Sequence, residues 1–175
     1  MIEVRDARPD DADAIASAHV EGWRGGYRGV FSDEFLDGDE FRSSRIAMWR
    51  GWTWNDHGRG HLLVSELDGD VVGFSLMGPA RDGDRLLDDV GEVYAFYLDP
   101  RAWGSGAATP LMARSVDLLA ADGHAHAVLW VLRDNPRARR FYAKSGWSPT
   151  GRETSWDGPG GAVPEVEYRI GLAAP

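Results

Sequence analysis

The sequence predicts a mixed α/β domain, and three observations carry that prediction. Segments whose apolar residues alternate, as in strands, take turns along the chain with segments whose apolar residues recur at helical spacing. A turn rich in glycine and alanine joins a strand to a helix in the middle of the chain. The length of 175 residues suffices for one domain with its own core, and no repeat or linker is recognisable. We therefore expect a single domain that spans residues 1–175.

The first part of the chain predicts a short strand and two helical segments. Residues 2–7 form the strand, and the acidic residues after Pro9 mark the start of a helix. One face of this helix is apolar and therefore buried, and it carries Ala12, Ile15, Ala16, His19, Val20 and Trp23. The glycines in 22–29 predict a loop, after which a second helical stretch covers 33–49.

The remaining elements alternate between strand and helix. Asp68-Gly69-Asp70 is a turn signal that joins strands at 61–67 and 71–77 into a hairpin. Further strands are expected at 92–98, 126–132, 147–150 and 166–171, and helices at 110–122 and 136–145. The last two strands flank a segment rich in glycine and proline at 158–164.

The composition excludes several kinds of site and partner. The chain has no cysteine, which excludes disulfides, cysteine-ligated metals and a thiol nucleophile. The net charge of −9 argues against nucleic acid as a partner, because binding it needs a basic face, and is compatible with a cationic substrate. The N-terminal segment resembles no secretion signal, and no apolar run is long enough to cross a membrane. We therefore expect a cytoplasmic protein with no membrane partner.

The middle of the chain has the pattern of a phosphate-binding turn. A strand ends at Asp99-Pro100, and Trp103-Gly104-Ser105-Gly106-Ala107-Ala108 then leads into a helix. The first N–H groups of a helix have no partner within the helix, and the helix dipole is positive at this end. Such a turn suits phosphate, so we expect a cosubstrate that carries phosphate.

A second group of residues follows this turn. Asn135 and Tyr142 are seven residues apart around a short helical segment, and Gly146-Trp147 comes soon after it. Together with the turn, in this order and spacing, these residues resemble the acetyl-CoA-binding core of the GNAT superfamily of N-acetyltransferases. The order of strands and helices extends the resemblance to nearly the whole chain.

The turn itself carries most of the superfamily's loop pattern, Gln/Arg-x-x-Gly-x-Gly/Ala. Gly106 and Ala108 fit the pattern, whereas Trp103 replaces the usual Gln or Arg. The resemblance implies a GNAT-like acyl-CoA N-acyltransferase fold of the α/β class. In this fold a mixed central sheet is splayed at the cofactor site and flanked by helices.

The resemblance implies acetyl-CoA as the cosubstrate and no metal. In the superfamily the strand before the turn pairs with the pantetheine arm of CoA, which here implies contacts with Phe96, Tyr97 and Leu98. The turn surrounds the pyrophosphate, which implies Gly104, Ser105, Gly106, Ala107, Ala108 and Thr109. Asn135 and Tyr142 complete the implied cofactor-binding set. The alternative interpretation is an ordinary buried strand followed by a tight turn.

The absence of cysteine excludes an acyl-cysteine intermediate, which favours direct transfer of the acetyl group to a primary amine in a ternary complex. The superfamily uses the position of Tyr142 as general acid for the departing thiolate. Glu92 lies six residues before Leu98, at the offset where the histone acetyltransferase branch has its general base. Alternation along the strand predicts one face that carries Glu92, Tyr94, Phe96 and Leu98. The alternative is that Glu92 is a solvated residue at the rim of the strand and that water is the base.

Substrate identity is expected to depend on residues 23–54, which hold eight of the chain's nineteen aromatic residues and several carboxylates. Aromatic faces and carboxylates can hold a cationic amine. Trp23, Tyr27 and Arg28, beside glycines in the predicted loop, are the expected substrate contacts. The acceptor stays open among a small amine, an antibiotic, an amino acid and a protein N-terminus, and a homodimer is compatible with the sequence.

Two other functions compete with the enzyme. A CoA-binding domain that regulates without catalysis would differ by only one or two substitutions, although Tyr142 and Glu92 favour catalysis. A nicotinamide-dependent dehydrogenase would use the glycine turn as its dinucleotide site, but Thr109 stands where the third glycine is needed.

Two further groups of residues have both a functional and a structural interpretation. Four arginines either meet the 3′-phosphate of CoA or form a solvated helix face, namely Arg133, Arg137, Arg139 and Arg140. Two histidine pairs suggest a metal but lack a third ligand, so we expect surface residues at His57, His61, His124 and His126.

Overall fold

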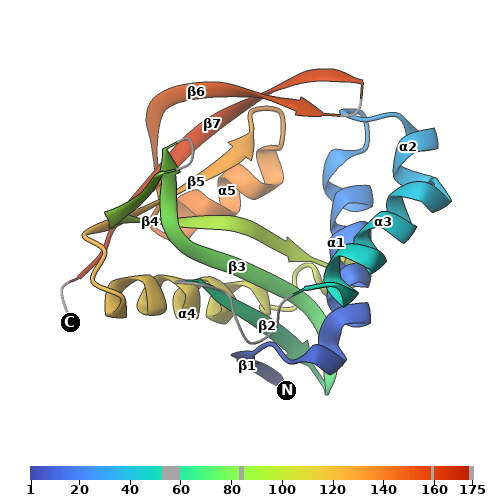
Figure 1. Ribbon diagram of the computed structural model, residues 1–175, viewed down its shortest axis with the longest axis horizontal. Coiled ribbons are helices and arrows are strands. Elements are labelled where there is room, and N and C mark those ends of the chain that lie inside the picture. The colour runs from blue at the N-terminus through green and yellow to red at the C-terminus, as the bar shows by residue number, and fades with distance from the viewer. Residues whose placement is uncertain (53–59, 83–84, 159, 174–175) are drawn as a thin grey trace.

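The described residues form a mixed sheet with helices on both faces. The computed structural model describes residues 1–52, 60–82, 85–158 and 160–173. In this part of the chain seven strands form one sheet in the order β1-β2-β3-β4-β5-β7-β6 (Figure 1). The strands are β1 Ile2–Asp6, β2 His61–Leu67, β3 Asp70–Asp82, β4 Arg85–Leu98, β5 His126–Leu132, β6 Ser148–Gly158 and β7 Gly161–Gly171. The α/β class is therefore confirmed.

The helices cover the two faces of this sheet unequally. Their bounds are α1 Ala12–Tyr27, α2 Asp33–Asp37, α3 Asp39–Arg50, α4 Ala108–Ala121 and α5 Pro136–Lys144. On one face α1 and α3 pack against the antiparallel strands β1 to β4, through a core that includes Ile15, Trp49 and Phe74. On the other face α4 and α5 cover the middle of the sheet, with Leu111 and Tyr142 in a second core.

Helix α1 is longer than predicted, because its glycines serve close packing instead of a loop. A Cβ added at Gly22 would lie 3.2 Å from the Tyr97 side chain, and one at Gly25 would lie 2.5 Å from Pro100. Glycine therefore lets α1 approach the end of β4 without a clash. The prediction that 22–29 is a loop was wrong for residues 22–27, so Trp23 and Tyr27 stand on a helix.

Two other boundaries also differ from the prediction. The helical stretch at 33–49 is divided at Gly38, whose backbone is extended, into α2 and α3. Strand β2 has its predicted bounds, whereas β3, β4, β6 and β7 extend beyond the predicted segments, and β7 includes most of the 158–164 segment. In each of these strands, backbone pairing with the neighbouring strand continues beyond the residues whose alternation predicted it.

A β-bulge in β4 reverses the alternation that the sequence predicted. Ala95 pairs with Leu76 of β3, but the next pair is Val93 with Met77, so Tyr94 is the extra residue. As a result Val93 packs in the same core as Phe96 and Leu98, against α4 and α5. The prediction that Glu92 shares a face with Phe96 and Leu98 was wrong, because neighbours along a strand point to opposite faces. Glu92 projects on the face that α1 covers.

A buried histidine ties α1 and α3 to β4. His19 is 6% exposed, accepts a hydrogen bond at Nδ1 from Trp49 Nε1 at 3.1 Å, and stacks on the Tyr97 ring at 4.8 Å. Burial, with a smaller effect of the charge on Arg45, lowers the pKa of His19 to about 3. Within the described residues no helix is long and apolar enough to cross a membrane.

We predict that His19 makes the fold less stable as the pH falls. The unfolded chain takes up a proton at His19 near its ordinary pKa of 6.5, while the folded chain takes it up only near 3. The free energy of unfolding should therefore fall between these pH values by up to about 1.4 kcal/mol per pH unit from this group. Replacement His19→Gln should make the slope shallower in denaturant titrations at several pH values. Equal slopes for the two proteins would contradict a neutral, buried His19.

Candidate active site

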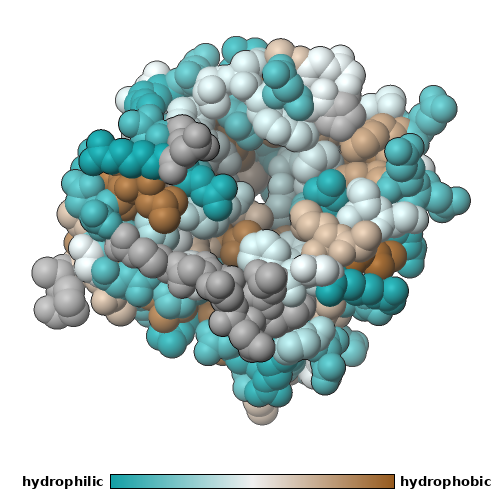
Figure 2. Space-filling model, in the orientation of Figure 1, coloured by the Kyte–Doolittle hydropathy of each residue, from teal (hydrophilic) through white to brown (hydrophobic). Residues whose placement is uncertain are grey.

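The strands β4 and β5 separate and leave a cavity between them. Their parallel ladder runs from Val90 with His126 to Val93 with Leu129 and ends there. A cavity of about 510 Å³ begins at this point, lined by α1, β4, the turn before α4, β5, α5 and parts of β6 and β7. Figure 2 shows that the surface is hollowed here, between the β6–β7 hairpin and the helices of the first half. The predicted splay of the sheet is therefore present.

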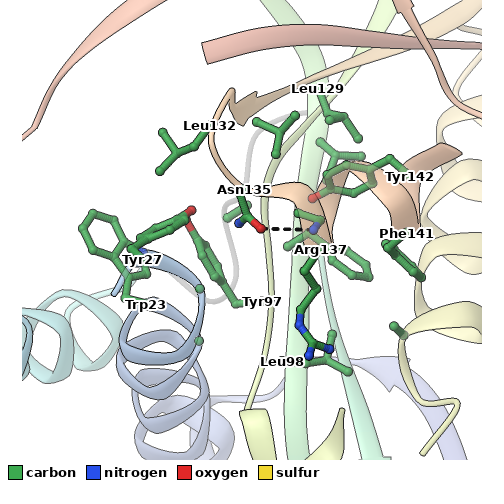
Figure 3. A pocket seen from close by; sticks show the side chains of 18 of the residues that line it. Trp23, Tyr27, Tyr97, Leu98, Leu129, Leu132, Asn135, Arg137, Phe141 and Tyr142 are labelled. Atoms are coloured by element: carbon green, nitrogen blue, oxygen red, sulfur yellow. Dashed lines mark hydrogen bonds between the residues drawn. The ribbon is translucent and has the colours of Figure 1, made fainter. Parts of the chain in front are cut away.

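Most of the predicted site residues line this one cavity. They are Trp23, Tyr27, Glu92, Phe96, Tyr97, Leu98, Gly104, Gly106, Ala108, Asn135 and Tyr142. In Figure 3, Trp23, Tyr27 and Tyr97 lie on one side, and Arg137, Phe141 and Tyr142 lie on the other. The sequence motifs, which are up to 120 residues apart, are thus brought together by the separation of two strands.

Three predicted residues of the turn shape it without lining the cavity. Ser105 Oγ donates to the carbonyl of Ala102 at 2.7 Å and accepts from the N–H of Ala107 at 3.2 Å. The N–H of Thr109 donates to the carbonyl of Gly106 at 3.2 Å. These bonds hold the turn in the shape that leads into α4.

Arg28 also lies outside the cavity lining. Its guanidinium forms hydrogen bonds with Asp33 at 2.8 Å and with both carboxylate oxygens of Asp37 at 2.7 and 2.9 Å. Arg28 thereby links the end of α1 to α2, and its guanidinium is paired with these carboxylates.

The turn before α4 is built for close approach of a ligand to the backbone. Gly104 and Gly106 have φ of +82° and +94°, a conformation that other residues adopt only with strain. No side chain caps the N-terminus of α4, a helix of 14 residues. The N–H of Thr109 is used within the turn, and the remaining first N–H groups and the positive end of the helix dipole are what this end offers to an anion.

Trp103 stands where the loop pattern has Gln or Arg, and Arg137 stacks on its ring. The Arg137 guanidinium lies 4.0 Å from the centre of the Trp103 ring, and both residues line the cavity. Arg137 belongs to the first turn of α5, so the positive charge beside the turn before α4 comes from another helix. Of the four arginines in this region, Arg137 is the one among the lining residues, while Arg139 bonds Tyr168 and the carbonyl of Arg133.

Asn135 and Tyr142 have distinct roles in α5. Asn135 caps the helix, since its Oδ1 accepts from the N–H of Ala138 at 3.1 Å (Figure 3). Tyr142 is 7% exposed, and its ring packs against Phe96 and Phe141. Its hydroxyl forms no hydrogen bond with a described residue and points into the cavity. Burial raises the pKa of Tyr142 far above its ordinary value, which keeps the proton on the hydroxyl.

Two further tyrosines face Tyr142 across the cavity. The hydroxyls of Tyr27 and Tyr97 are 3.2 Å apart, one on α1 and the other on β4. Burial raises the pKa of both tyrosines, so both are neutral hydrogen-bonding groups. The wall on the α1 side is thus aromatic but carries polar groups that can orient a substrate.

Glu92 is a half-buried carboxylate of the cavity wall. It accepts a hydrogen bond from the backbone N–H of Arg81 at 3.2 Å. Burial, and then the charge of Glu167, raise the pKa of Glu92 above its ordinary value. A carboxylate whose pKa is raised is a stronger base near neutral pH than an ordinary glutamate.

Three residues that were not predicted from the sequence also line the cavity, namely Trp130, Trp156 and Glu165. Glu165 stands at the start of an alternating segment in which Val166, Tyr168 and Ile170 face the core. The alternation of polar and apolar residues was visible in the sequence. It did not show that the polar face of this strand lies at the cavity.

The histidines differ from the prediction in part. His61 pairs with Asp122 at 2.8 Å. His124 is buried, against the expectation of a surface residue, because a ring nitrogen bonds the carbonyl of Asp88 at 2.9 Å. His57 and the aromatic residue Trp54 lie outside the described residues. In the described part of the chain, no group of three His, Cys, Asp or Glu residues could hold a metal ion.

Comparisons with known proteins show the family of this chain. The model of the acetyltransferase (GNAT) family matches residues 26–147, more than half of the chain. The uncharacterized N-acetyltransferase YuaI of Bacillus subtilis is 29% identical over 145 residues, which cover 83% of this chain and 80% of that protein. An uncharacterized N-acetyltransferase of Archaeoglobus fulgidus is 30% identical, over 81% of this chain and 90% of its own.

Solved structures have the same fold. The chain superposes on YncA, a putative acetyltransferase of Salmonella typhimurium solved with its cofactor acetyl-CoA, with a TM-score of 0.71. The two are 22% identical, and the match covers 100% of this chain and 98% of YncA. From the family model and these relatives, the chain belongs to the GNAT family of acetyltransferases.

Proposed function

We propose that the protein is an N-acetyltransferase that moves an acetyl group from acetyl-CoA directly to a primary amine in a ternary complex. One observation carries the proposal: a single cavity joins the glycine turn before α4, a gap between two strands, a protonated tyrosine and a carboxylate. The free hydroxyl of Tyr142 in the same cavity as Glu92 favours catalysis over a domain that only binds acyl-CoA.

The residues present fit acetyl-CoA. The uncapped N-terminus of α4 and Arg137 suit the phosphates, since both offer positive charge and N–H donors. The side of β4 beyond Val93 lacks a strand partner among the described residues, which suits the amides of the pantetheine arm. Acetyl-CoA supplies a thioester whose carbonyl carbon an amine can attack.

The chain's own groups would move the protons of the transfer. Glu92 would take a proton from the ammonium of the acceptor, so that its nitrogen lone pair can form the amide bond. As the carbon–sulfur bond breaks, its electron pair leaves with the sulfur. Tyr142 would give its proton to the thiolate, and the second proton that the nitrogen loses as it becomes an amide would restore the tyrosine.

We predict that Gly106→Glu removes the thermal stabilisation by acetyl-CoA. The wild type should gain about 2.7 kcal/mol at a hundredfold excess over Kd. The new side chain would fill the turn and repel phosphate, although its Cβ meets no atom closer than 3.6 Å. Gly151→Glu is the matched control, because Gly151 also has a positive φ and nothing within 4 Å of a Cβ, outside the cavity lining. Equal ligand-induced shifts in Tm for both variants would contradict the assignment of the turn.

We predict that Tyr142→Phe lowers kcat by roughly 10²–10⁴ while the affinity for acetyl-CoA stays within several-fold. The ring packing is preserved and only the hydroxyl is lost. Release of free thiol from acetyl-CoA with a panel of amines measures the rate. Tyr168→Phe is the control, because this buried hydroxyl bonds Arg139 and is not part of the cavity lining. If Tyr142→Phe keeps the wild-type kcat, Tyr142 is not the acid.

We predict that Glu92→Gln loses most of its rate at low pH. A base works only when it is unprotonated, so the wild-type rate should rise with pH through the raised pKa of Glu92. In the variant, higher pH should partly restore kcat/KM, because hydroxide and solvent then remove the proton. Tyr142→Phe should gain nothing comparable from higher pH. Wild-type turnover of Glu92→Gln at every pH would show that the base is another group.

A further inference from the structure

Two carboxylates on one wall of the cavity have no ion-pair partner among the described residues. They are Glu92 of β4 and Glu165 of β7. Val93 and Val166 both pack in the core on the α4 and α5 side, so their neighbours Glu92 and Glu165 project on the opposite face, toward α1. Both carboxylates therefore lie on the side of the cavity where Tyr27 and Trp156 stand.

The third carboxylate on this face, that of Glu167, has an ion-pair partner. Glu167 is buried, accepts from Thr150 Oγ1 at 3.0 Å and pairs with Arg152 at 2.8 Å. The fold thus pairs the carboxylate that is outside the cavity lining and leaves the two lining ones without an ion pair among the described residues, with the charge of Arg81 acting on Glu92. Two half-buried charges of the same sign destabilise each other, and a cationic ligand would relieve both.

The surroundings of Glu92 and Glu165 also suit a cation. Trp156 and Trp130 line the same cavity, and Trp156 meets the Trp23 ring edge-on at 5.7 Å. Such rings accept an ammonium group or an alkyl chain. Among the described lining residues the cationic side chain is Arg137, which is stacked on Trp103 at the turn.

The side chain of Tyr142 is separate evidence that this cavity holds a ligand. The residue is 7% exposed, and its hydroxyl has no hydrogen-bond partner among the described residues and points into the space between the two walls (Figure 3). A tyrosine packed in this way suits a ligand that bonds its hydroxyl inside the cavity.

The sheet places the two carboxylates at separate points along the wall. Glu92 stands beside Val128 of β5, while Glu165 stands beside Leu132. Four residues of a strand span roughly 13 Å, and β5 lies between β4 and β7, so the two backbone positions are farther apart than that. One ammonium group therefore does not serve both equally well.

We propose that the acceptor carries two ammonium groups joined by a short apolar chain, with Glu92 receiving the one that reacts and Glu165 the other. Glu165 then selects the substrate and takes no part in proton transfer. The role given to Glu92 rests on the proposed function, whereas the binding of a dication does not.

Binding of two amines of equal length tests the proposal. Diaminobutane has an ammonium group at each end, whereas butylamine has one, and calorimetry measures both on protein saturated with CoA. The wild type should bind diaminobutane about ten- to hundredfold more tightly, the size of effect expected for one added hydrogen-bonded charge. Equal affinities in the wild type overturn the proposal, and this comparison needs no variant.

The variant Glu165→Gln should remove most of this preference. The control Glu153→Gln makes the same change of charge on the neighbouring strand. Glu153 is exposed and pairs with Val166, so it lies on the other face of the hairpin, and its variant should keep the preference. A preference that survives in Glu165→Gln, or that disappears in both variants, overturns the assignment to Glu165.

Thiol release from acetyl-CoA in the same samples separates this inference from the proposed function. Tight binding of diaminobutane without acetylation of any amine would contradict the proposed acetyltransferase function and support the dication site. Acetylation of both amines with equal kcat/KM would support the enzyme and overturn the choice of a dication.

Discussion

The separation of β4 from β5 beyond Val93 and Leu129 is the constraint on which the rest of the structure depends. Backbone N–H and C=O groups that leave a ladder in a buried place need other partners. The gap thus suits a ligand that carries amides of its own, and the cavity surrounds it. On one side α5 supplies Tyr142, and on the other α1 supplies Tyr27.

The walls of the gap are held by contacts that reach far into the core. Glycines let α1 lie directly on the end of β4, and His19 links Trp49 of α3 to the ring of Tyr97. The bulge at Tyr94 turns Glu92 away from α4 and toward the α1 side. Without the bulge the carboxylate of Glu92 would face the apolar core, whereas with it the carboxylate lines the cavity.

Local sequence predicted the parts of the site that depend on local structure. The turn at 103–108 and the short helix between Asn135 and Gly146 are set by residues within a few positions, so their patterns were recognisable in the sequence. The helical state of Gly22 and Gly25 depends on Tyr97 and Pro100, which are distant in sequence, and local propensity predicted a loop. Glu165 was missed for the same reason, because only the tertiary fold places β7 beside the cavity. The bulge in β4 likewise depends on the pairing with β3.

Amide hydrogen exchange with and without acetyl-CoA tests the central claim most directly. If the gap between β4 and β5 holds the pantetheine arm, the amides of residues 94–98 that face the gap should exchange fast in the free protein and be protected by the ligand. The amides of the same strand that bond β3 should be protected in both states. Protection confined to the turn at 103–108, with no change in 94–98, would contradict the account, because the ligand would then bind without entering the gap.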